Sequence, residues 1–411
     1  MMIKNNIAGA PKSFQQGTHR TVSPAVTLAK ASAFLSQMGI TRIANVTGLD
    51  RIGVPVVTVM RPNSRSLSIS QGKGVTLDAA KASGVMEAVE SYHAERIEHP
   101  LKFGSFNDLA ANHRLADVAR LARINGRHFH QDLPLFWIEG FDLVTGETVW
   151  LPYETVHSNY TIPAITDSGC FVASTNGLAS GNHIFEATAH GIGEVVERDA
   201  NTLWNLLPEK SRADTRLDMS TIDDELCLGV IEKLRNADMS IGVWDITSDT
   251  GIPSFYCLII DEQREIAHSG AGAGCHPSRE IALLRALTEA IQVRTNYITG
   301  ARDDLEQAEY TQAGIADKLN WAKKLVNRRD GAVVDFQKIT SQTFDTLKQD
   351  VDWMVEQLKA VGITQVISVN LTRAEFEIPV VRIVIPGLEG PDDHASYCPG
   401  ERALNISGAQ S

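Results

Sequence analysis

The sequence lacks the features that would assign it to several common classes of protein. Its 411 residues contain only five cysteines, which are far apart and include no C-x-x-C pair. An odd number of scattered cysteines argues against a disulfide framework or a zinc knuckle and predicts reduced thiols. No apolar run approaches the roughly 18 residues that a membrane-spanning helix needs, and the N-terminal stretch lacks the apolar core of a signal peptide. We therefore expect a cytoplasmic protein that does not act at a membrane.

Positive charge is also scarce. The chain has 38 Lys and Arg against 50 Asp and Glu, which gives a formal net charge of −12. Nucleic acids and anionic membranes both require a positive surface, so neither is expected as the main partner. This balance still allows a local basic pocket for a phosphorylated ligand. With 43% hydrophobic and 21% charged residues, the composition is that of a globular protein with a sizeable core.

Low-complexity linkers and internal repeats are absent as well. Hydrophobic periodicity predicts strands over Val54–Pro62 and 252–261, a hairpin over Leu133–Pro152, and helices over 23–39, Leu77–Glu98, Asn107–Ile124, Leu226–Ala237 and His276–Ile298. Residues 1–20 are polar, and we expect them to be poorly ordered. Strands and helices mix without a strict βαβ alternation. The pattern therefore predicts an α+β fold in which mixed sheets pack against long helices.

Several nucleotide-binding and hydrolase motifs are missing. There is no G-x-x-x-x-G-K-[ST] loop and no G-x-S-x-G elbow. The stretch SGAGAGCHPSRE resembles a dinucleotide-binding loop, but Gly270, Gly272 and Gly274 simply alternate. Cys275 beside His276 is interpreted as a structural cysteine rather than a nucleophile. We expect neither a P-loop protein, nor an NAD-dependent enzyme, nor a serine hydrolase.

Glutamates on two long predicted helices are the most informative feature present. Glu87 and Glu90 are three residues apart and share a helix face. Glu186 and Glu197 are eleven residues apart, about three turns, and Glu194 lies close to the same side. These glutamates could form solvated helix faces or a shared metal site. A solvated face usually alternates in sign, yet no Lys or Arg lies between Glu186 and Glu194.

The metal hypothesis has a physical basis. Buried carboxylates repel one another unless a cation neutralises them. Mg²⁺ prefers carboxylate and amide oxygens and often bridges to phosphate. Asn182, four residues before Glu186, extends the polar row. His183 and His190 flank this row, and we interpret them as local hydrogen-bonding residues.

A magnesium–nucleotide site also needs cations for the phosphates. Arg198 directly follows Glu197, and Arg285 lies four residues before Glu289 on the third long helix. Lys73 lies between two glycines just before the first acidic helix. Simpler interpretations remain open, namely an exposed turn lysine at Lys73 and an intrahelical ion pair between Arg285 and Glu289.

Three blocks of sequence together resemble the YcaO family. They are KASGVMEAVESYHAER, STNGLASGNHIFEATAHGIGEVVERDA and SREIALLRALTEAIQVR, and they match in order, spacing and chemistry. The resemblance implies a YcaO catalytic domain over 65–400, preceded by an N-terminal segment (1–64) and followed by a C-terminal tail (401–411). The stretches GTHRTVSP and YCPGERA further resemble the subgroup that works with TfuA-type partner proteins.

The resemblance also implies cofactors and site residues. ATP and Mg²⁺ are the expected cofactors. Carried over position by position, the family's blocks imply metal ligands at Glu87, Glu90, Glu186, Glu194 and Glu197. They imply nucleotide contacts at Lys73, Ser83, Asn182, Arg198 and Arg285, with Arg285 and Glu289 as catalytic residues. One departure is Ala179, where the family often has a hydroxyl residue, and neighbouring Ser180 is a candidate replacement.

Enzymes of this kind phosphorylate a backbone amide oxygen and so make the carbonyl carbon electrophilic. External sulfide then gives a thioamide, whereas a Cys, Ser or Thr side chain gives an azoline ring. The TfuA-like stretches and the absence of a proline-rich end favour a thioamide, with azoline formation as the alternative. A non-catalytic scaffold that binds nucleotide or peptide is a third possibility. The expected partners are a peptide or protein substrate, a TfuA-like protein, a sulfur donor and a second copy of the chain.

Overall fold

The computed structural model describes residues 9–162, 167–263, 267–392 and 397–408, and these residues form three sheets. The smallest sheet has the order β1-β2-β3, with β1 (Arg42–Asn45), β2 (Val56–Met60) and β3 (Ile69–Lys73). Helices α1 (Pro24–Ser32) and α2 (Leu77–Ala94) pack together, and α2 covers β2 and β3. Residues on both sides of position 64 therefore belong to one sheet.

The second sheet contains five strands in the order β11-β10-β9-β8-β12. Their bounds are Gly270–Cys275, Ser254–Asp261, Met239–Asp245, Arg216–Asp218 and Val333–Asp335. Only β8 and β12 pair in parallel. The neighbouring helices are α5 (Glu209–Ala213), α6 (Glu225–Asn236), α7 (Arg279–Thr299) and α8 (Gln312–Asn327), and α7 lies directly on β11.

The third sheet has the order β4-β5-β13-β14-β7, and β6 pairs with β5. These strands are β4 (Leu101–Gly104), β5 (Leu135–Asp142), β6 (Glu147–Pro152), β7 (Leu178–Ser180), β13 (Ile367–Asn370) and β14 (Val380–Val384). The associated helices are α3 (Phe106–Ala110), α4 (Ile184–Leu206), α9 (Leu347–Ala360) and α10 (Glu401–Gly408). The predicted hairpin is confirmed as β5 and β6, with Gly146 in the left-handed region at φ 72°.

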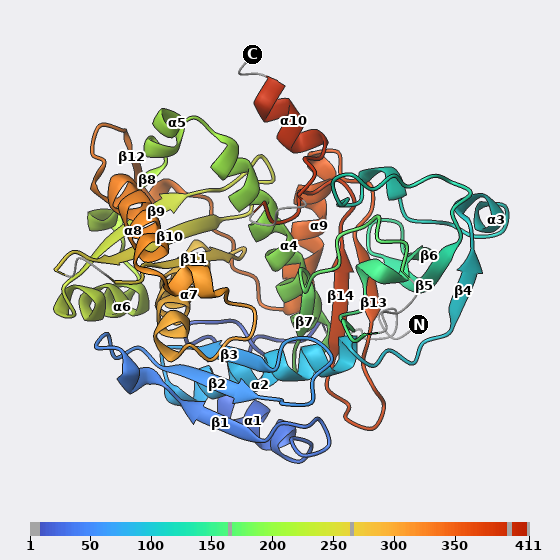
Figure 1. Cartoon of the computed structure of the whole chain (residues 1–411), viewed down its shortest axis with the longest axis horizontal. Helices are drawn as coiled ribbons and strands as arrows, with labels where there is room; N and C mark the ends of the chain where they lie inside the picture. The colour runs from blue at the N-terminus through green and yellow to red at the C-terminus, as the bar shows by residue number, and fades with distance from the viewer. Residues whose placement is uncertain (1–8, 163–166, 264–266, 393–396, 409–411) are drawn as a thin grey trace.

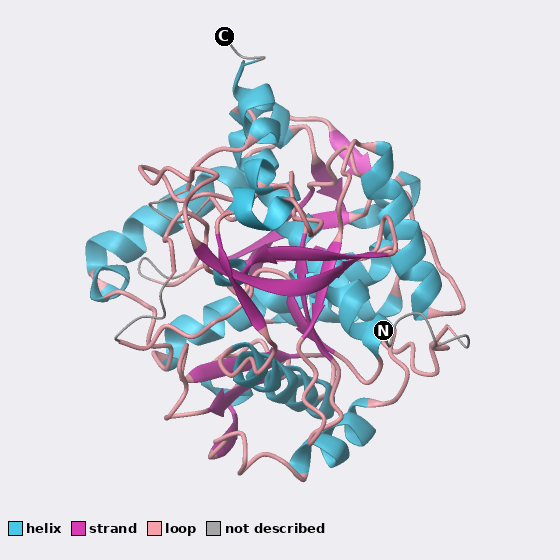
Figure 2. Cartoon of the chain, turned by 90° about the vertical axis from the view of Figure 1, so that its right-hand side faces the viewer, coloured by secondary structure: helices cyan, strands magenta, loops and turns pink. Residues whose placement is uncertain are grey.

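Helix α4 runs through the middle of the molecule, between the five-stranded and six-stranded sheets (Figure 1). Its apolar side contributes Ile192 and Val196 to a core that includes Ile383 of β14 and Val351 of α9. From the side, the strands gather at the centre and the helices lie around them (Figure 2). The predicted α+β class with mixed sheets and long helices is confirmed. No helix within the described ranges is long and apolar enough to cross a membrane.

The alternating glycines of SGAGAG are a strand, not a nucleotide-binding loop. They form β11, and their spacing is the two-residue period of a strand face. A Cβ at Gly272 would lie 2.3 Å from the Ala290 nitrogen, and one at Gly274 would lie 2.1 Å from the Ala282 oxygen. The glycines therefore let α7 lie directly on β11. Gly72 does the same for α2, because a Cβ there would lie 1.9 Å from the Ala80 oxygen.

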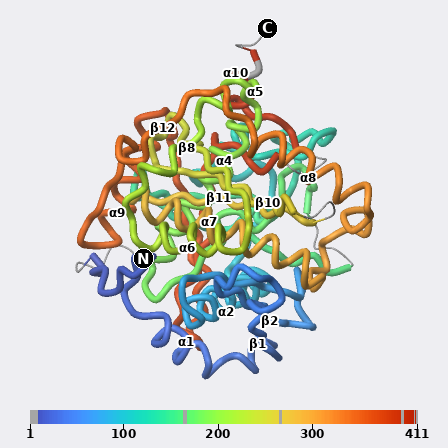
Figure 3. Tube along the Cα trace, turned by 90° about the vertical axis from the view of Figure 1, so that its left-hand side faces the viewer, coloured from blue at the N-terminus to red at the C-terminus, as the bar shows by residue number. Residues whose placement is uncertain are grey.

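Two expectations about local structure are wrong. The region Asn107–Ile124 is not one helix, because it contains only the end of α3 and a 3₁₀ turn at Val118–Arg120. Residues 9–20 are ordered by tertiary contacts, whereas residues 1–8 lie outside the described residues. Lys12 is buried and donates to Asp350 at 2.8 Å, and the N-terminal segment lies alongside α9 (Figure 3).

Candidate active site

Five carboxylates from three helices influence one another in a single acidic cluster. Its members are Glu87 and Glu90 on α2, Glu194 and Glu197 on α4, and Glu289 on α7. The apolar side of α4 faces the core, and this places the glutamates of α4 toward the other two helices. The structure thus brings together four of the five predicted metal ligands with Glu289. Their convergence argues against the solvated-face interpretation.

Burial raises the pKa of most members of this cluster. It raises the pKa of Glu87, Glu194 and Glu197 to about 7. Burial raises the pKa of Glu90 to about 8, and the neighbouring charges of Glu87 and Glu194 add to the effect. Several carboxylates held close together in a dry site repel one another unless a cation is present.

Glu90 is the member with the clearest structural anchor. Its Oε1 accepts from the Ser180 amide at 2.8 Å and from the Ser180 hydroxyl at 2.7 Å. Ser180 comes from β7, so this contact ties α2 to the six-stranded sheet. Ala179, the departure from the family pattern, is fully buried in the core. Ser180, the candidate replacement, therefore orients a predicted metal ligand.

Cations lie beside the carboxylates. The Lys73 ammonium donates to Glu289 at 2.6 Å. Burial raises the pKa of Glu289, but the charges of Lys73 and Arg198 outweigh it and hold the pKa below its usual value. Arg198 also lowers the pKa of Glu194 and Glu197, against the effect of burial. Lys73 is thus not a free turn lysine, and its partner is on a different helix.

Arg285 does not pair with Glu289 within its helix. Its Nη1 donates to the Cys275 carbonyl at 3.0 Å. Burial lowers its pKa to about 10, and the charge of Arg20 acts in the same direction, while Glu197 opposes it. Arg285 stays protonated at neutral pH and lies within electrostatic range of the cluster. Cys275 itself has its pKa raised to about 12 by burial, which supports its structural interpretation.

Glu186 and Asn182 belong to a separate hydrogen-bond network. The Glu186 carboxylate accepts from the Thr21 amide at 2.9 Å and its hydroxyl at 3.1 Å, and from Arg20 at 3.4 Å. It also accepts from the Asn182 amide at 3.1 Å and side chain at 3.0 Å. The structure therefore places Glu186 against the N-terminal segment, with its oxygens already engaged. Ser83 is exposed on α2, and within the described part of the chain no hydrogen bond joins its side chain to the cluster.

A histidine-containing group near Arg285 was missed by sequence reasoning. His19, His276 and Asp350 offer ligand atoms within 4.8 Å of one another. Lys12 already pairs with Asp350. Burial lowers the pKa of His19, and the charges of Lys12 and Arg285 lower it further. These positive charges oppose a divalent cation here. The stretch GTHR pointed to this region, but nothing in its spacing predicted contact with residues 276 and 350.

The chemistry of the acidic cluster fits Mg²⁺. Carboxylate oxygens are the ligands that this hard cation prefers, and a cation would relieve the repulsion that raises the pKa values. Glu87, Glu90, Glu194 and Glu197 would hold it. Lys73, Arg198 and Arg285 supply the cations that a polyphosphate needs. Arg302, from the segment after α7, lowers the pKa of Glu87 against the effect of burial and was not predicted.

A cavity elsewhere in the fold does not coincide with the acidic cluster. A cavity of about 330 Å³ is lined by residues 114–119, Gln131 and Gln365, among others, and by none of the predicted site residues. The Arg114 side chain at its edge is already paired with Asp142 at 2.9 Å. The convergence of charged groups is therefore the better guide to the site.

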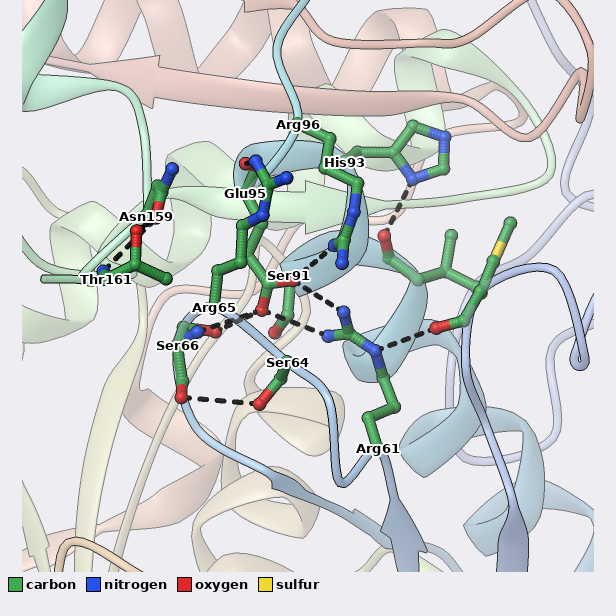
Figure 4. A network of polar contacts seen from close by, with 12 residues as sticks. Arg61, Ser64, Arg65, Ser66, Ser91, His93, Glu95, Arg96, Asn159 and Thr161 are labelled. Atoms are coloured by element: carbon green, nitrogen blue, oxygen red, sulfur yellow. Dashed lines mark hydrogen bonds and ion pairs between the residues drawn. The ribbon is translucent and has the colours of Figure 1, made fainter. Parts of the chain in front are cut away.

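The last residues of the first sequence block serve the fold. Glu95 at the end of α2 accepts from the buried Arg61 at 2.6 and 3.3 Å, and from the Ser66 hydroxyl at 2.6 Å (Figure 4). Burial raises the pKa of Glu95, but Arg61 outweighs it and holds the pKa below its usual value. Arg96 also donates to Glu95 at 2.6 Å. This network joins the end of α2 to the segment between β2 and β3.

The second TfuA-like stretch, YCPGERA, also has a structural role. Glu389 accepts from the Tyr397 hydroxyl at 2.8 Å, the Gly400 amide at 2.9 Å and the Ala403 amide at 3.0 Å. Arg402 donates to Asp199 of α4 at 2.9 and 3.0 Å. The stretch thereby attaches the C-terminal segment to the helix that carries Glu194 and Glu197.

The fold and the site together define a protein with a cluster of carboxylates flanked by lysine and arginine side chains. A family model described as YcaO cyclodehydratase, ATP- and Mg²⁺-binding, matches residues 71–389. The chain belongs to the YcaO family, and the predicted family and cofactors, ATP and Mg²⁺, are confirmed at this level.

Similar sequences support this assignment. An uncharacterized protein in the tfuA 3′ region of Rhizobium leguminosarum bv. trifolii is 34% identical over 409 residues, which cover 95% of this chain and 94% of that protein. An uncharacterized protein of Methanothermobacter thermautotrophicus is 33% identical over 376 residues, covering 90% of this chain and 95% of that protein.

Solved structures share the fold. YcaO from Methanopyrus kandleri, bound with AMPPCP and Mg²⁺, is 23% identical, with a TM-score of 0.76 and coverage of 95% of this chain and 99% of that one. A heterocyclase in complex with substrate and cofactor is 22% identical, with a TM-score of 0.78 over 94% of this chain. This chain spans about half of the heterocyclase, since the match covers 54% of it.

Proposed function

We propose that this protein uses ATP and Mg²⁺ to activate a backbone amide of a peptide and then adds sulfide to give a thioamide. The observation that carries the ATP- and Mg²⁺-dependent part is the cluster of Glu87, Glu90, Glu194 and Glu197, with raised pKa values and adjacent cations. Such an arrangement is unfavourable in the free protein and becomes favourable when cations and a polyphosphate are bound.

In this proposal each group has a defined role. The four glutamates hold Mg²⁺, which when bound neutralises the phosphates of ATP. Lys73, Arg198 and Arg285 bind phosphate oxygens, and Glu289 orients Lys73 through the 2.6 Å contact. Catalysis then depends on positioning and electrostatics, as is general for phosphoryl transfer. Asn182 and Glu186 belong to the network that anchors the N-terminal segment beside this site.

The chemistry balances without a redox partner. The amide oxygen attacks the terminal phosphorus of ATP, and the bond to the bridging oxygen breaks and releases ADP. Hydrosulfide adds to the activated carbon, and the carbon–oxygen bond then breaks so that phosphate leaves with the electron pair and the sulfur-bound proton. The sum is amide, ATP and hydrosulfide giving thioamide, ADP and hydrogen phosphate.

The sulfide branch is supported by sequence context. The Rhizobium relative lies in a tfuA 3′ region and matches nearly the whole chain. GTHRTVSP and YCPGERA, the stretches that suggested a TfuA-type partner, both lie beside the site. Arg20 and Thr21 of the first contact Glu186, and Arg402 of the second contacts Asp199. We therefore propose a TfuA-like protein and an external sulfur donor as partners, a cytoplasmic location, and a homodimer as the working state.

Azoline formation is the second candidate. The family model is described as a cyclodehydratase, and one structural neighbour is a heterocyclase in complex with substrate. The same amide activation would serve both reactions, since they differ only in the nucleophile. In this case a Cys, Ser or Thr side chain of the peptide would attack, and no external sulfide would be consumed.

One experiment separates these functions. The protein is incubated with ATP, Mg²⁺, sulfide, the TfuA-like partner and candidate peptides, and the products are weighed by mass spectrometry. A mass gain equal to sulfur minus oxygen, dependent on sulfide, is the expected result. Loss of one water from the peptide would replace the thioamide proposal by the azoline one. Absence of ATP hydrolysis and of any product under all conditions would favour a non-catalytic scaffold.

A further inference from the structure

A buried arginine beside the acidic cluster has almost no partner. Arg382 on β14 is 2% exposed, and among the described residues its side chain donates only through Nη2, to the Ser174 carbonyl at 2.5 Å. Its Nε and Nη1 are buried without a partner. Leaving such donors unpaired in a dry environment is strongly unfavourable. Because the fold retains these unpaired donors, we expect a ligand group to bind them.

A second unpaired group faces the same space. Arg382 and Asn176 both line a small cavity of about 70 Å³, with apolar walls that include Val172, Val195 and Leu388. The Oδ1 of Asn176 is buried and accepts no hydrogen bond from the described residues. The cavity therefore presents one planar set of donors and one acceptor. Thr155, Ser174 and Glu389 also line it, and the Glu389 carboxylate already accepts from other groups of the chain. Its volume exceeds the roughly 30 Å³ that one water occupies in the liquid.

The cavity adjoins the proposed phosphoryl-transfer site. Val195, which lines it, directly follows Glu194 on α4. The charge of Arg382 lowers the pKa of Glu194, against the effect of burial, so the two side chains lie within electrostatic range. Arg382 nevertheless makes no hydrogen bond to Glu194 within the described part of the chain. Its guanidinium is oriented by the Ser174 carbonyl and keeps its other donors available.

A backbone amide complements this pair of groups. Its carbonyl oxygen accepts hydrogen bonds and its N–H donates one, and the group is planar. We propose that Arg382 and Asn176 form the subsite that holds the peptide amide to be activated, with the guanidinium on the amide oxygen and Asn176 Oδ1 on the amide N–H. This inference rests on the proposed function, since it assigns the substrate subsite of that reaction.

The same guanidinium then serves the second half of the reaction. Once the oxygen is phosphorylated, the planar fork of Arg382 can donate to two phosphoryl oxygens. After sulfide has added to the carbon, the carbon–oxygen bond breaks and its electron pair moves onto that oxygen, and Arg382 stabilises the charge that builds there. It then holds the phosphate that departs with the electron pair. A lysine ammonium at this position would supply the positive charge but not the two parallel N–H donors.

The test compares Arg382→Gln, Arg382→Lys and Asn176→Ala with a matched control, Arg216→Gln. Arg216 lies on β8 and donates to backbone carbonyls, one of them Val326 at 2.9 Å, so it lacks unpaired donors of this kind. We expect Arg382→Gln to lower the rate of peptide modification at least ~100-fold with an unchanged KM for ATP. Arg382→Lys should restore little, and Asn176→Ala should raise the KM for the peptide ~10-fold.

A second measurement does not depend on the peptide. Binding of inorganic phosphate to the protein loaded with Mg²⁺ and ADP is measured by equilibrium dialysis, and Arg382→Gln should weaken it ~10-fold or more. Arg382→Gln should also leave the ligand-free protein at least as stable as the wild type, because it removes unpaired buried donors. Equal phosphate binding by the variant and the wild type, or a large loss of stability in Arg382→Gln, would overturn the subsite.

Failure of the proposed function is distinguishable from failure of the subsite. If the wild type forms azolines, the thioamide proposal fails while the amide subsite stands, provided that Arg382→Gln loses that activity. If the wild type modifies no peptide but Arg382→Gln alone loses phosphate binding, the phosphate-binding part of the subsite stands without the reaction. If all variants modify peptide at the wild-type rate, the subsite is rejected and the function stands.

Discussion

Helix α2 carries glutamates in opposite electrostatic states. Glu95 at the C-terminal end is buried with Arg61, Ser66 and Arg96 around it, and these partners hold its pKa below the usual value despite burial. Glu87 and Glu90, one to two turns earlier, are half-buried, and desolvation raises their pKa to about 7 and about 8. One helix therefore contains a carboxylate whose charge is neutralised by protein partners and which supports the fold. It also contains two carboxylates whose charge a bound cation would neutralise.

Helix α4 also carries an arginine-paired carboxylate, Asp199, but burial raises its pKa to about 6 despite the pair. Asp199 is fully buried and accepts two hydrogen bonds from Arg402, which come from the C-terminal segment. Glu194 and Glu197, which precede it, have pKa values raised to about 7 by burial. Burial alone does not distinguish structural from functional acids. The presence or absence of a protein partner for the charge does.

The largest expected effect lies at the compensated end of α2. Glu95→Gln leaves the Arg61 guanidinium buried without its counter-charge, so the free energy of unfolding should fall by about 3–5 kcal/mol. Denaturant unfolding measures the loss. The double variant Arg61→Leu/Glu95→Leu removes both charges and should recover most of the stability. A loss below about 1 kcal/mol in Glu95→Gln would show that the pair is dispensable.

The next effect lies in the uncompensated cluster. Glu194→Gln removes a proposed metal ligand, so ATP turnover should fall at least ~100-fold while the fold is retained. Phosphate release measures turnover, and circular dichroism checks the fold. Glu356→Gln, a change at an exposed glutamate of α9, is the control and should leave turnover unchanged. Phosphate release from Glu194→Gln at the wild-type rate would reject the metal assignment.

Although Glu194→Gln should lower ATP turnover, it should raise the stability of the metal-free protein. The folded pKa of Glu194 is raised above its usual value of 4.5 to about 7, so between these values the folded protein holds a proton that the unfolded chain releases. Its contribution therefore falls as the pH rises through this window. Glu194→Gln should be more stable than the wild type by on the order of 1–2 kcal/mol at about pH 8, and not at about pH 5.

Denaturant unfolding of both proteins in the presence of a chelator, at the two pH values, tests this expectation. Added Mg²⁺ and nucleotide should abolish the advantage of the variant, because the ligand stabilises only the wild-type site. A variant less stable than the wild type at both pH values would mean that Glu194 is a structural acid like Glu95.

The smallest expected effect is at an exposed ion pair, and it tests whether an ion pair without burial contributes to stability. Glu209 accepts from Lys324 at 2.7 Å, but both side chains are more than half exposed. Solvent screens such a pair, so Lys324→Ala should not move the denaturation midpoint measurably. A shift comparable to that of Glu95→Gln would contradict the view that burial and pairing must combine.

Much of the local structure was predictable from the sequence. Apolar periodicity placed α2, α6, α7 and the β5–β6 hairpin within a few residues, and the helix predicted to carry Glu186, Glu194 and Glu197 is α4. Short strands such as β7 and β12 were missed, because three residues carry too little periodic signal. The helix expected over Asn107–Ile124 failed because its apolar residues pack on β5 and nearby segments rather than forming one helix face. The glycines of β11 suggested a loop until the close approach of α7 explained them.

For the candidate site, the sequence by itself determined which helix faces bear Glu87, Glu90, Glu194 and Glu197, because the 3.6-residue turn is a local property of the chain. Only the tertiary structure decided that these faces meet, that Glu186 contacts the N-terminal segment, and that Arg382 Nε and Nη1 and Asn176 Oδ1 lack partners among the described residues around one cavity. The reason is physical: periodicity acts over neighbouring residues, whereas the pairing of a buried charge depends on which distant segment packs against it.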